Sequence, residues 1–418
     1  MVDACVSVII PTYNRRDYVQ EAIDSVLAQR YTNYEIIVID DGSTDGTGEA
    51  LRARYGDRIR YEWQENQGES VARNRGIELA RGEFVAFLDS DDLWFPRKLG
   101  KQVEFMEANP GVGMVFSQAW AIDEVGDRIP DLRLVRDITS DDLTLERLCF
   151  DCPMSSGSST GLVRKSILDA SGGFDPAIRY GEDEDLWVRI RLLTDIRFLP
   201  DALACMRRHK QSQSYYPSSE QNSQRLAAYL ATREKLFSAW SEAPEGLHQQ
   251  AVAWQYAKAS LREALSGDEQ AARACLKEAA KHNTRLLTDY VRFGTEIAGQ
   301  VARFYERGDK SDVHSALSLL HFLLTLVGDF GYYDQTFARK TRAACYKALG
   351  FTANRMRDNA AVLYCFPRAL ILNPSLANNR GILSMLLAAT LPEKLFAACK
   401  ELYLRLSKRR AVSRELEG

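Results

Sequence analysis

The chain has 418 residues, a length that suits two or three domains better than one. Its 54 Lys and Arg residues nearly balance 57 Asp and Glu residues, which gives a formal net charge of −3. Because the phosphate backbone favours a basic excess, this balance argues against a nucleic-acid-binding protein. Hydrophobic residues make up 45% of the chain and charged residues 27%, proportions that exclude disorder and collagen-like repeats.

The first half alternates between strand-like and helix-like segments. Its strand-like segments are apolar runs rich in β-branched residues, and its helix-like segments repeat apolar residues at i, i+3 and i+4. Asn14 precedes the first helix and is expected to cap it. Such alternation predicts βαβ units and a largely parallel sheet. The expected strands are 6–10, 35–39, 58–63 and 83–88, and the expected helices are 18–27, 45–54 and 70–80.

The second half is rich in Ala, Leu, Arg and Glu and has helical periodicity throughout. Residues 256–283 resemble residues 346–373 at a constant offset of 90 residues. This similarity suits either tetratricopeptide-like units or a plain helical bundle. A tetratricopeptide unit has about 34 residues, and the offset of 90 is not a multiple of that length, so a regular array is not established. We therefore expect an α/β domain over 1–215 and a helical domain over 216–418.

The cysteines and the apolar runs predict a reduced, cytoplasmic protein. Eight cysteines are too few for a disulfide scaffold, and Cys149 and Cys152 alone have CxxC spacing. No basic segment of a signal peptide opens the chain. The longest run without an acidic or basic residue, 313–328, is shorter than the roughly 20 residues that span a bilayer and is expected to form a buried helix.

Polar and acidic residues gather where the expected strands end, which is where open α/β sheets bind ligands. Carboxylates that lie side by side repel unless a cation or proton joins them, and a hard divalent metal also bridges to substrate phosphates. Capping of the next helix would need one Asp, whereas the third cluster has three. The clusters are Pro11-Thr12-Tyr13-Asn14, Asp40-Asp41-Gly42-Ser43 and Asp89-Ser90-Asp91-Asp92.

Several other nucleotide or metal motifs are excluded. The run from Asp41 resembles the start of a calcium-binding EF-hand, but its twelfth position is Arg52 rather than Glu. A nucleotide-binding turn suits it better, with Asp41 accepting from a base N–H and Tyr13 stacking on the ring. The chain has neither a P-loop nor a GxGxxG motif after the first strand, which disfavours P-loop enzymes and dinucleotide oxidoreductases.

A second acidic cluster, 182–185, begins an expected helix after Gly181. Acidic side chains are favourable at the positive N-terminal end of a helix, which explains part of the cluster. The other interpretation is that one of these carboxylates is a general base near a sugar acceptor. Residues 207–214 close the first half with basic and hydroxyl side chains around His209, which suits phosphate.

About the first 215 residues resemble a family-2 glycosyltransferase of GT-A fold. The resemblance rests on the order and spacing of segments 6–14, 40–45, 89–92 and 181–183, together with His209. The resemblance implies inverting, metal-dependent transfer of a sugar from a nucleotide sugar, by default a UDP-sugar, to an acceptor hydroxyl. Cell-surface polysaccharide or glycoconjugate assembly is the implied setting, with a glycan or lipid-linked acceptor.

The resemblance also implies the role of each site residue. Tyr13 would stack on the nucleobase, Asp41 would hydrogen-bond it, and Arg73 would lie near the phosphates. Asp183, or in its place Glu182 or Asp185, would be the general base. Pro11, Thr12, Asn14, Asp89, Ser90 and Asp91 complete the expected nucleotide-sugar site, and Asp89, Asp91, Asp92 and His209 are the expected contacts of Mn²⁺ or Mg²⁺.

Two alternatives remain at this level: a non-catalytic nucleotide-sugar-binding or interaction protein, and a nucleotidyltransferase. The helical half offers a surface for a protein partner or for peripheral contact with the inner face of a membrane. The amphipathic segment 394–406 with the basic residues 408–410 can touch anionic lipid, or it is a solvated helix end.

Overall fold

The computed structural model describes residues 6–133, 139–140, 143–150, 158–209, 218–283, 285, 293–307, 313–329, 335–356 and 358–390. It divides into two compact units, Met1–Gln255 and Tyr256–Gly418. Cys152 of the CxxC pair, residues 210–214 and the segment 394–410 lie outside the described residues.

The first unit is built on a mixed sheet. Its described strands follow the order β3-β2-β1-β4-β8-β6-β9-β5, and β7 pairs with β6. β3, β2, β1 and β4 are parallel, as the βαβ pattern predicts. The sheet is not largely parallel beyond them, because β8 runs antiparallel to β4 and β6. The strands are β1 Val6–Thr12, β2 Tyr34–Asp40, β3 Arg60–Trp63, β4 Phe84–Phe87, β5 Leu93–Trp94, β6 Val112–Ile122, β7 Arg128–Arg133, β8 Gly161–Arg164 and β9 Asp195–Arg207.

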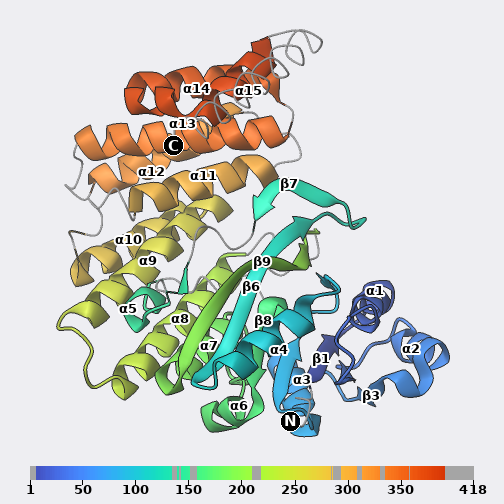
Figure 1. Ribbon diagram of the computed structural model, residues 1–418. Helices are drawn as coiled ribbons and strands as arrows, with labels where there is room; N and C mark the ends of the chain where they lie inside the picture. The colour runs from blue at the N-terminus through green and yellow to red at the C-terminus, as the bar shows by residue number, and fades with distance from the viewer. Residues whose placement is uncertain are drawn as a thin grey trace, which may run out of the picture. The chain divides into compact units, whose positions relative to one another are not determined.

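Helices pack closely on this sheet, with α3 against β1 and β2 and α4 against β6 (Figure 1). A Cβ at Gly76 on α3 would lie 2.3 Å from Ile9 Cγ2, so the glycine allows the close approach of α3 to β1. The helices of this unit are α1 Arg16–Leu27, α2 Thr47–Tyr55, η1 Gly56–Arg58, α3 Glu69–Leu79, α4 Lys98–Ala108, α5 Leu145–Leu148, η3 Ser158–Thr160, α6 Lys165–Ser171, α7 Glu182–Leu193 and α8 Ser219–Ala239.

The strands and helices expected over residues 6–88 are confirmed with small shifts at their ends. The expected cap of the first helix is wrong. The N-cap of α1 is Arg15, which makes no side-chain capping bond. Asn14 has a φ of 51°, and its Oδ1 accepts from the backbone N–H of Thr44 at 2.8 Å. The Asn14 side chain therefore joins the turn after β1 to the turn after β2.

The second unit is helical, as expected. α13 packs against both α11 and α14 (Figure 1). The division between the units falls within α9, and the boundary expected near residue 215 stays a prediction. The helices are α9 Leu247–Ser266, α10 Glu269–His282, α11 Thr295–Arg307, α12 Val313–Asp329, α13 Gln335–Arg355, α14 Asn359–Leu372, η6 Pro374–Asn378 and α15 Arg380–Thr390.

The internal similarity at an offset of 90 residues has a structural counterpart. Asp268 caps α10 and Asp358 caps α14, and each carboxylate accepts from the backbone N–H of the third residue that follows. One more helix pair, α11 and α12, lies between the two similar segments. The starts of α10, α12 and α14 are separated by 44 and 46 residues (313 − 269 and 359 − 313). The spacing is longer than the 34 residues of tetratricopeptide units.

The uncharged run 313–328 forms α12, whose apolar side chains are mostly buried, which confirms the expected buried helix. Among the helices that the structure describes, none combines the length and the apolar character that crossing a bilayer requires.

Candidate active site

The turn after β1 presents one aromatic side chain to solvent. Pro11 and Thr12 end β1 and are buried, whereas Tyr13 is 49% exposed. The turn is held by Asn14, whose backbone N–H donates to Ser43 Oγ at 2.9 Å. An exposed ring on a fixed turn at the carboxyl end of a central strand can stack on a flat ligand.

Asp41, at the end of β2, is engaged by the protein itself. It is 4% exposed. Its Oδ1 accepts from Gln64 Nε2 at 2.7 Å and from the Gln67 backbone N–H at 3.0 Å, and its Oδ2 accepts from the Gly68 N–H at 2.8 Å. Asp41 therefore fixes the segment that leads from β3 into α3.

The acidic loop 89–92 follows β4, and its three carboxylates have different surroundings. Asp92 is 3% exposed, and its oxygens accept from Ser159 Oγ at 2.6 Å and from the Arg207 backbone N–H at 2.9 Å. Burial and the neighbouring carboxylates of Asp91 and Asp89 raise the pKa of Asp92 well above its usual value. Ser159 also accepts from the Asp89 backbone N–H at 3.1 Å, so Ser159 and Asp92 lock the loop.

Asp91 is more open and lies beside His209, the residue expected from the end of the first half. The Asp91 Oδ2 atom is 2.7 Å from His209 Nε2, and Arg15 Nη1 is 3.3 Å from the same nitrogen. In one neutral tautomer Nε2 can donate to Asp91 or accept from Arg15, but not both. Burial would raise the pKa of Asp91, but the His209 hydrogen bond and the Arg15 charge outweigh burial and lower it.

Arg73, on α3, is only 2% exposed and binds three carboxylates. Its Nη2 is 2.6 Å from Glu69 Oε1 and 2.9 Å from Asp89 Oδ1, and its Nη1 is 3.0 Å from Glu182 Oε1. A single guanidinium therefore connects α3, the acidic loop after β4 and the first turn of α7. The place near the phosphates that the resemblance implies for Arg73 stays a prediction.

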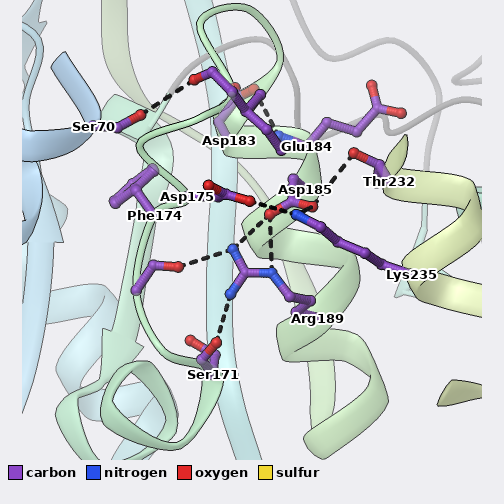
Figure 2. Close-up of polar contacts among 12 residues, drawn as sticks. Ser70, Ser171, Phe174, Asp175, Asp183, Glu184, Asp185, Arg189, Thr232 and Lys235 are labelled. Atoms are coloured by element: carbon purple, nitrogen blue, oxygen red, sulfur yellow. Dashed lines mark hydrogen bonds and ion pairs between the residues drawn. The ribbon is translucent and has the colours of Figure 1, made fainter. Parts of the chain in front are cut away.

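The first turn of α7 carries four consecutive acids. Glu182 pairs with Arg73, and Glu184 pairs with Arg233 of α8 at 2.5 Å. Asp185 is fully buried and binds three side chains: Arg189 at 2.6 Å, Lys235 at 3.2 Å and Thr232 at 3.4 Å. Figure 2 shows Arg189, Thr232 and Lys235 directed at the Asp185 carboxylate.

Asp183 differs from these neighbours. Among the described residues it has no basic partner, and its Oδ1 accepts from the Glu184 backbone N–H at 2.7 Å. Burial raises the pKa of Asp183 well above its usual value, and the negative charges of Glu182 and Glu184 add to the effect against the opposing charge of Arg73. A partly buried carboxylate of raised pKa that forms no ion pair among the described residues is suited to accept a proton near neutral pH.

A divalent metal fits one part of this site. Within the described residues no three His, Cys, Asp or Glu side chains converge as a ready-made metal cluster. Asp91 and His209 nevertheless lie side by side, and the side chains of Asp91 and Asp89 are 22% and 24% exposed. Mg²⁺ commonly takes one or two carboxylates and completes its shell with water and substrate phosphates. Asp92 fits less well because hydrogen bonds occupy both of its oxygens.

The structure thus gathers Asp89, Asp91, His209, Arg73, Glu182 and Asp183 around the carboxyl end of β4, with Ser90 in the same loop. Sequence reasoning missed Ser159, Arg15 and Arg233. No motif marks them, since each acts through a contact with a residue that is distant along the chain.

Comparison with known proteins finds glycosyltransferases similar to the first half of the chain. Residues 7–169 match the model of glycosyl transferase family 2. An uncharacterized glycosyltransferase of Rickettsia bellii is 34% identical over 238 residues, 56% of this chain and 33% of the relative. One of Rickettsia typhi is 35% identical over 212 residues, 49% of this chain and 64% of the relative. TuaG of Bacillus subtilis, a glycosyltransferase whose name assigns it to teichuronic acid biosynthesis, is 50% identical over 104 residues, 24% of this chain and 41% of TuaG.

Residues 7–169 are therefore similar to family-2 glycosyltransferases, and the mixed sheet agrees with the GT-A fold that the resemblance implies. The chain spans about one third to two thirds of the length of these curated relatives. A solved structure of Staphylococcus aureus TarS 1–349 with UDP-GlcNAc is 18% identical, with a TM-score of 0.48, and covers 84% of this chain and 91% of that one. The similarity to family 2 rests on the sequence matches alone.

Proposed function

We propose that the protein transfers a sugar from a nucleotide sugar to an acceptor hydroxyl with inversion at the anomeric carbon, and that Asp183 is the general base. The observation that carries the proposal is the contrast within α7. Glu182, Glu184 and Asp185 are each neutralised by a basic side chain, whereas Asp183 has no basic partner among the described residues.

The raised pKa of Asp183 suits this role, because a carboxylate of ordinary pKa is a weak base at neutral pH. The base would take the proton of the acceptor hydroxyl as its oxygen attacks the anomeric carbon. The bond from that carbon to the nucleoside diphosphate breaks on the opposite face. One displacement of this kind inverts the configuration, and holding donor and acceptor together supplies much of the rate.

The leaving diphosphate would lie at the acidic loop after β4. Asp91 and His209 would hold Mn²⁺ or Mg²⁺, with Asp89 beside them, and the bound cation would stabilise charge on the departing diphosphate. We assign Asp92 and Arg73 to holding the loop and the base-bearing helix in place. Their contacts to Ser159, Asp89 and Glu182 support this assignment.

The nucleobase would stack on Tyr13, whose exposure at the end of β1 leaves its ring accessible. Asp41 would support this pocket through the 64–68 segment, since its oxygens already accept from protein donors. A UDP-sugar is the first donor to test. The match to TuaG supports polysaccharide or glycoconjugate assembly as the setting and a glycan or lipid-linked acceptor.

The proposal is tested by incubating the full chain with a panel of nucleotide sugars, Mn²⁺ and candidate acceptors. We expect release of nucleoside diphosphate and a product of inverted anomeric configuration. Release of pyrophosphate instead would indicate nucleotidyl transfer. A panel without turnover, although the nucleoside diphosphates bind, would indicate a non-catalytic binding protein.

A further inference from the structure

The acidic first turn of α7 is held from two sides by arginines. Arg73 reaches Glu182 from α3, and Arg233 reaches Glu184 from α8. The proposed base, Asp183, lies between these two acids in the sequence. Residues 7–169, which match the family model, contain Arg73 but not Arg233.

Arg233 is built into the unit and has no contact with solvent. It is 0% exposed, and its Nη2 lies 2.5 Å from Glu184 Oε1. Its Nε donates to the Cys149 carbonyl at 2.9 Å, and its Nη2 also approaches the Leu148 carbonyl at 3.3 Å. These charge-assisted contacts of Nε and Nη2 hold the buried guanidinium in one geometry.

A direct chain of contacts leads from Arg233 to the base. Arg233 binds the carboxylate of Glu184, and the backbone N–H of Glu184 donates to Asp183 Oδ1 at 2.7 Å. Fixing the position of Glu184 therefore fixes one oxygen of Asp183. A displacement of about 1 Å at a reacting group can cost on the order of 100-fold in rate.

We infer that Arg233 is a positioning residue of this glycosyltransferase, which orients the Asp183 carboxylate through the side chain and backbone N–H of Glu184. This inference rests on the proposed role of Asp183 as the base. It makes α8, which lies beyond the matched segment, a part of the catalytic apparatus.

The charges around Asp183 contribute to its pKa, and a change at Glu184 should therefore shift it. Glu182 and Glu184 on α7 raise the pKa of Asp183, and Arg73 from α3 lowers it. Glu184→Gln removes one of the negative charges but leaves an amide oxygen that can still accept from Arg233. Glu184→Leu removes the contact altogether.

The chain offers a matched control. Arg164 pairs with Glu83 at 2.9 Å and donates to the carbonyls of Val112 and Met106, as Arg233 does to those of Cys149 and Leu148. Glu83 precedes β4, at the end of the strand opposite to the acidic loop. Glu83→Leu therefore removes an ion pair with the same kinds of partners, although a more exposed one (the Glu83 side chain is 58% exposed and that of Glu184 7%), without touching the proposed site.

The experiment measures steady-state nucleoside diphosphate release by the full chain, with the most active sugar of the panel, well below each variant's Tm. We expect Glu184→Leu and Arg233→Met to lower kcat by about 10- to 100-fold, with nucleoside diphosphate Kd unchanged by calorimetry. Arg233→Lys should recover part of the loss, and Glu83→Leu should keep wild-type kcat. Glu184→Gln should keep most of kcat and move the acidic limb of kcat/KM to lower pH.

If folded Glu184→Leu loses no more kcat than Glu83→Leu, the positioning role is refuted. An acidic limb that stays in place in Glu184→Gln would also contradict it. If Arg233→Met does not fold, the two Glu184 variants still decide. Asp183→Asn separates this inference from the proposed function, because full activity in Asp183→Asn would reject the base itself. Loss of activity in Asp183→Asn with wild-type kinetics in the Arg233 and Glu184 variants would reject only the positioning role.

Discussion

Asp183 and Asp185 lie two residues apart on α7, and the structure predicts opposite consequences for their loss. Asp183→Asn retains an oxygen that can accept from the Glu184 N–H, so few stabilising contacts change. It removes the carboxylate that would take the acceptor proton. We expect kcat to fall by about 10²- to 10⁴-fold with little change in Tm.

Asp185→Asn should instead affect stability. The carboxylate is fully buried, and its loss leaves Arg189 without this ion pair, whereas Lys235 keeps its closer partner Asp175 at 2.6 Å. Arg189 and Lys235 are 21% and 40% exposed, so water offsets part of the loss and the cost falls below the usual range for a fully buried pair. A cost of about 2 kcal/mol corresponds to a Tm lowered by about 4–8 °C for a unit of this size.

Both variants, with Glu182→Gln in parallel, are compared by nucleoside diphosphate release and scanning calorimetry. The nucleoside diphosphate Kd should stay near wild type in Asp183→Asn. If Asp183→Asn turns over normally while Asp185→Asn or Glu182→Gln is folded and inactive, the base is that other residue. If all three are active, the first turn of α7 is only a structural cluster of acids and the base lies elsewhere.

Three further predictions follow from the same structure. EDTA should abolish transfer, and Mn²⁺ or Mg²⁺ should restore it. The His209→Ala variant should need a higher metal concentration, because His209 lies 2.7 Å from Asp91. Full activity in the presence of chelator would refute a metal site. Tyr13→Ala should raise the donor KM more than it lowers kcat, since the exposed ring would touch the base and not the reacting bond; an unchanged KM would contradict the stacking role. Burial lowers the pKa of Lys98 well below its usual value, so the unfolded state binds the proton more tightly and the free energy of unfolding falls as pH drops below about 10. In denaturant titrations, the free energy of unfolding of Lys98→Met minus that of wild type should therefore be larger at about pH 6 than at about pH 9. An equal difference at both pH values would contradict the lowered pKa of Lys98.

The sequence by itself determined the elements of the first half and the location of the acidic loop. Buried strands require unbroken apolar runs, and residues 6–10 and 83–88 have them, so the strands are visible without any partner. The carboxyl ends of parallel strands meet at one edge of the sheet, and this rule places Tyr13, Asp41 and Asp89 at the same edge from the sequence alone. The antiparallel placement of β8 had no such local signal.

The tertiary structure alone decided which of the four acids of α7 has no basic partner among the described residues. The sequence 182–185 presents four consecutive acids that local rules cannot distinguish, because all four suit the start of a helix. They differ through Arg73, Arg233 and Lys235, each of which lies at least 49 residues along the chain from its acidic partner (233 − 184). The contacts of Asp92 and Arg73 could not be predicted either, since their partners come from other strands and helices. Ion pairs and burial are properties of neighbours in space, and the electrostatics of a catalytic carboxylate depends on those neighbours rather than on the motif that contains it.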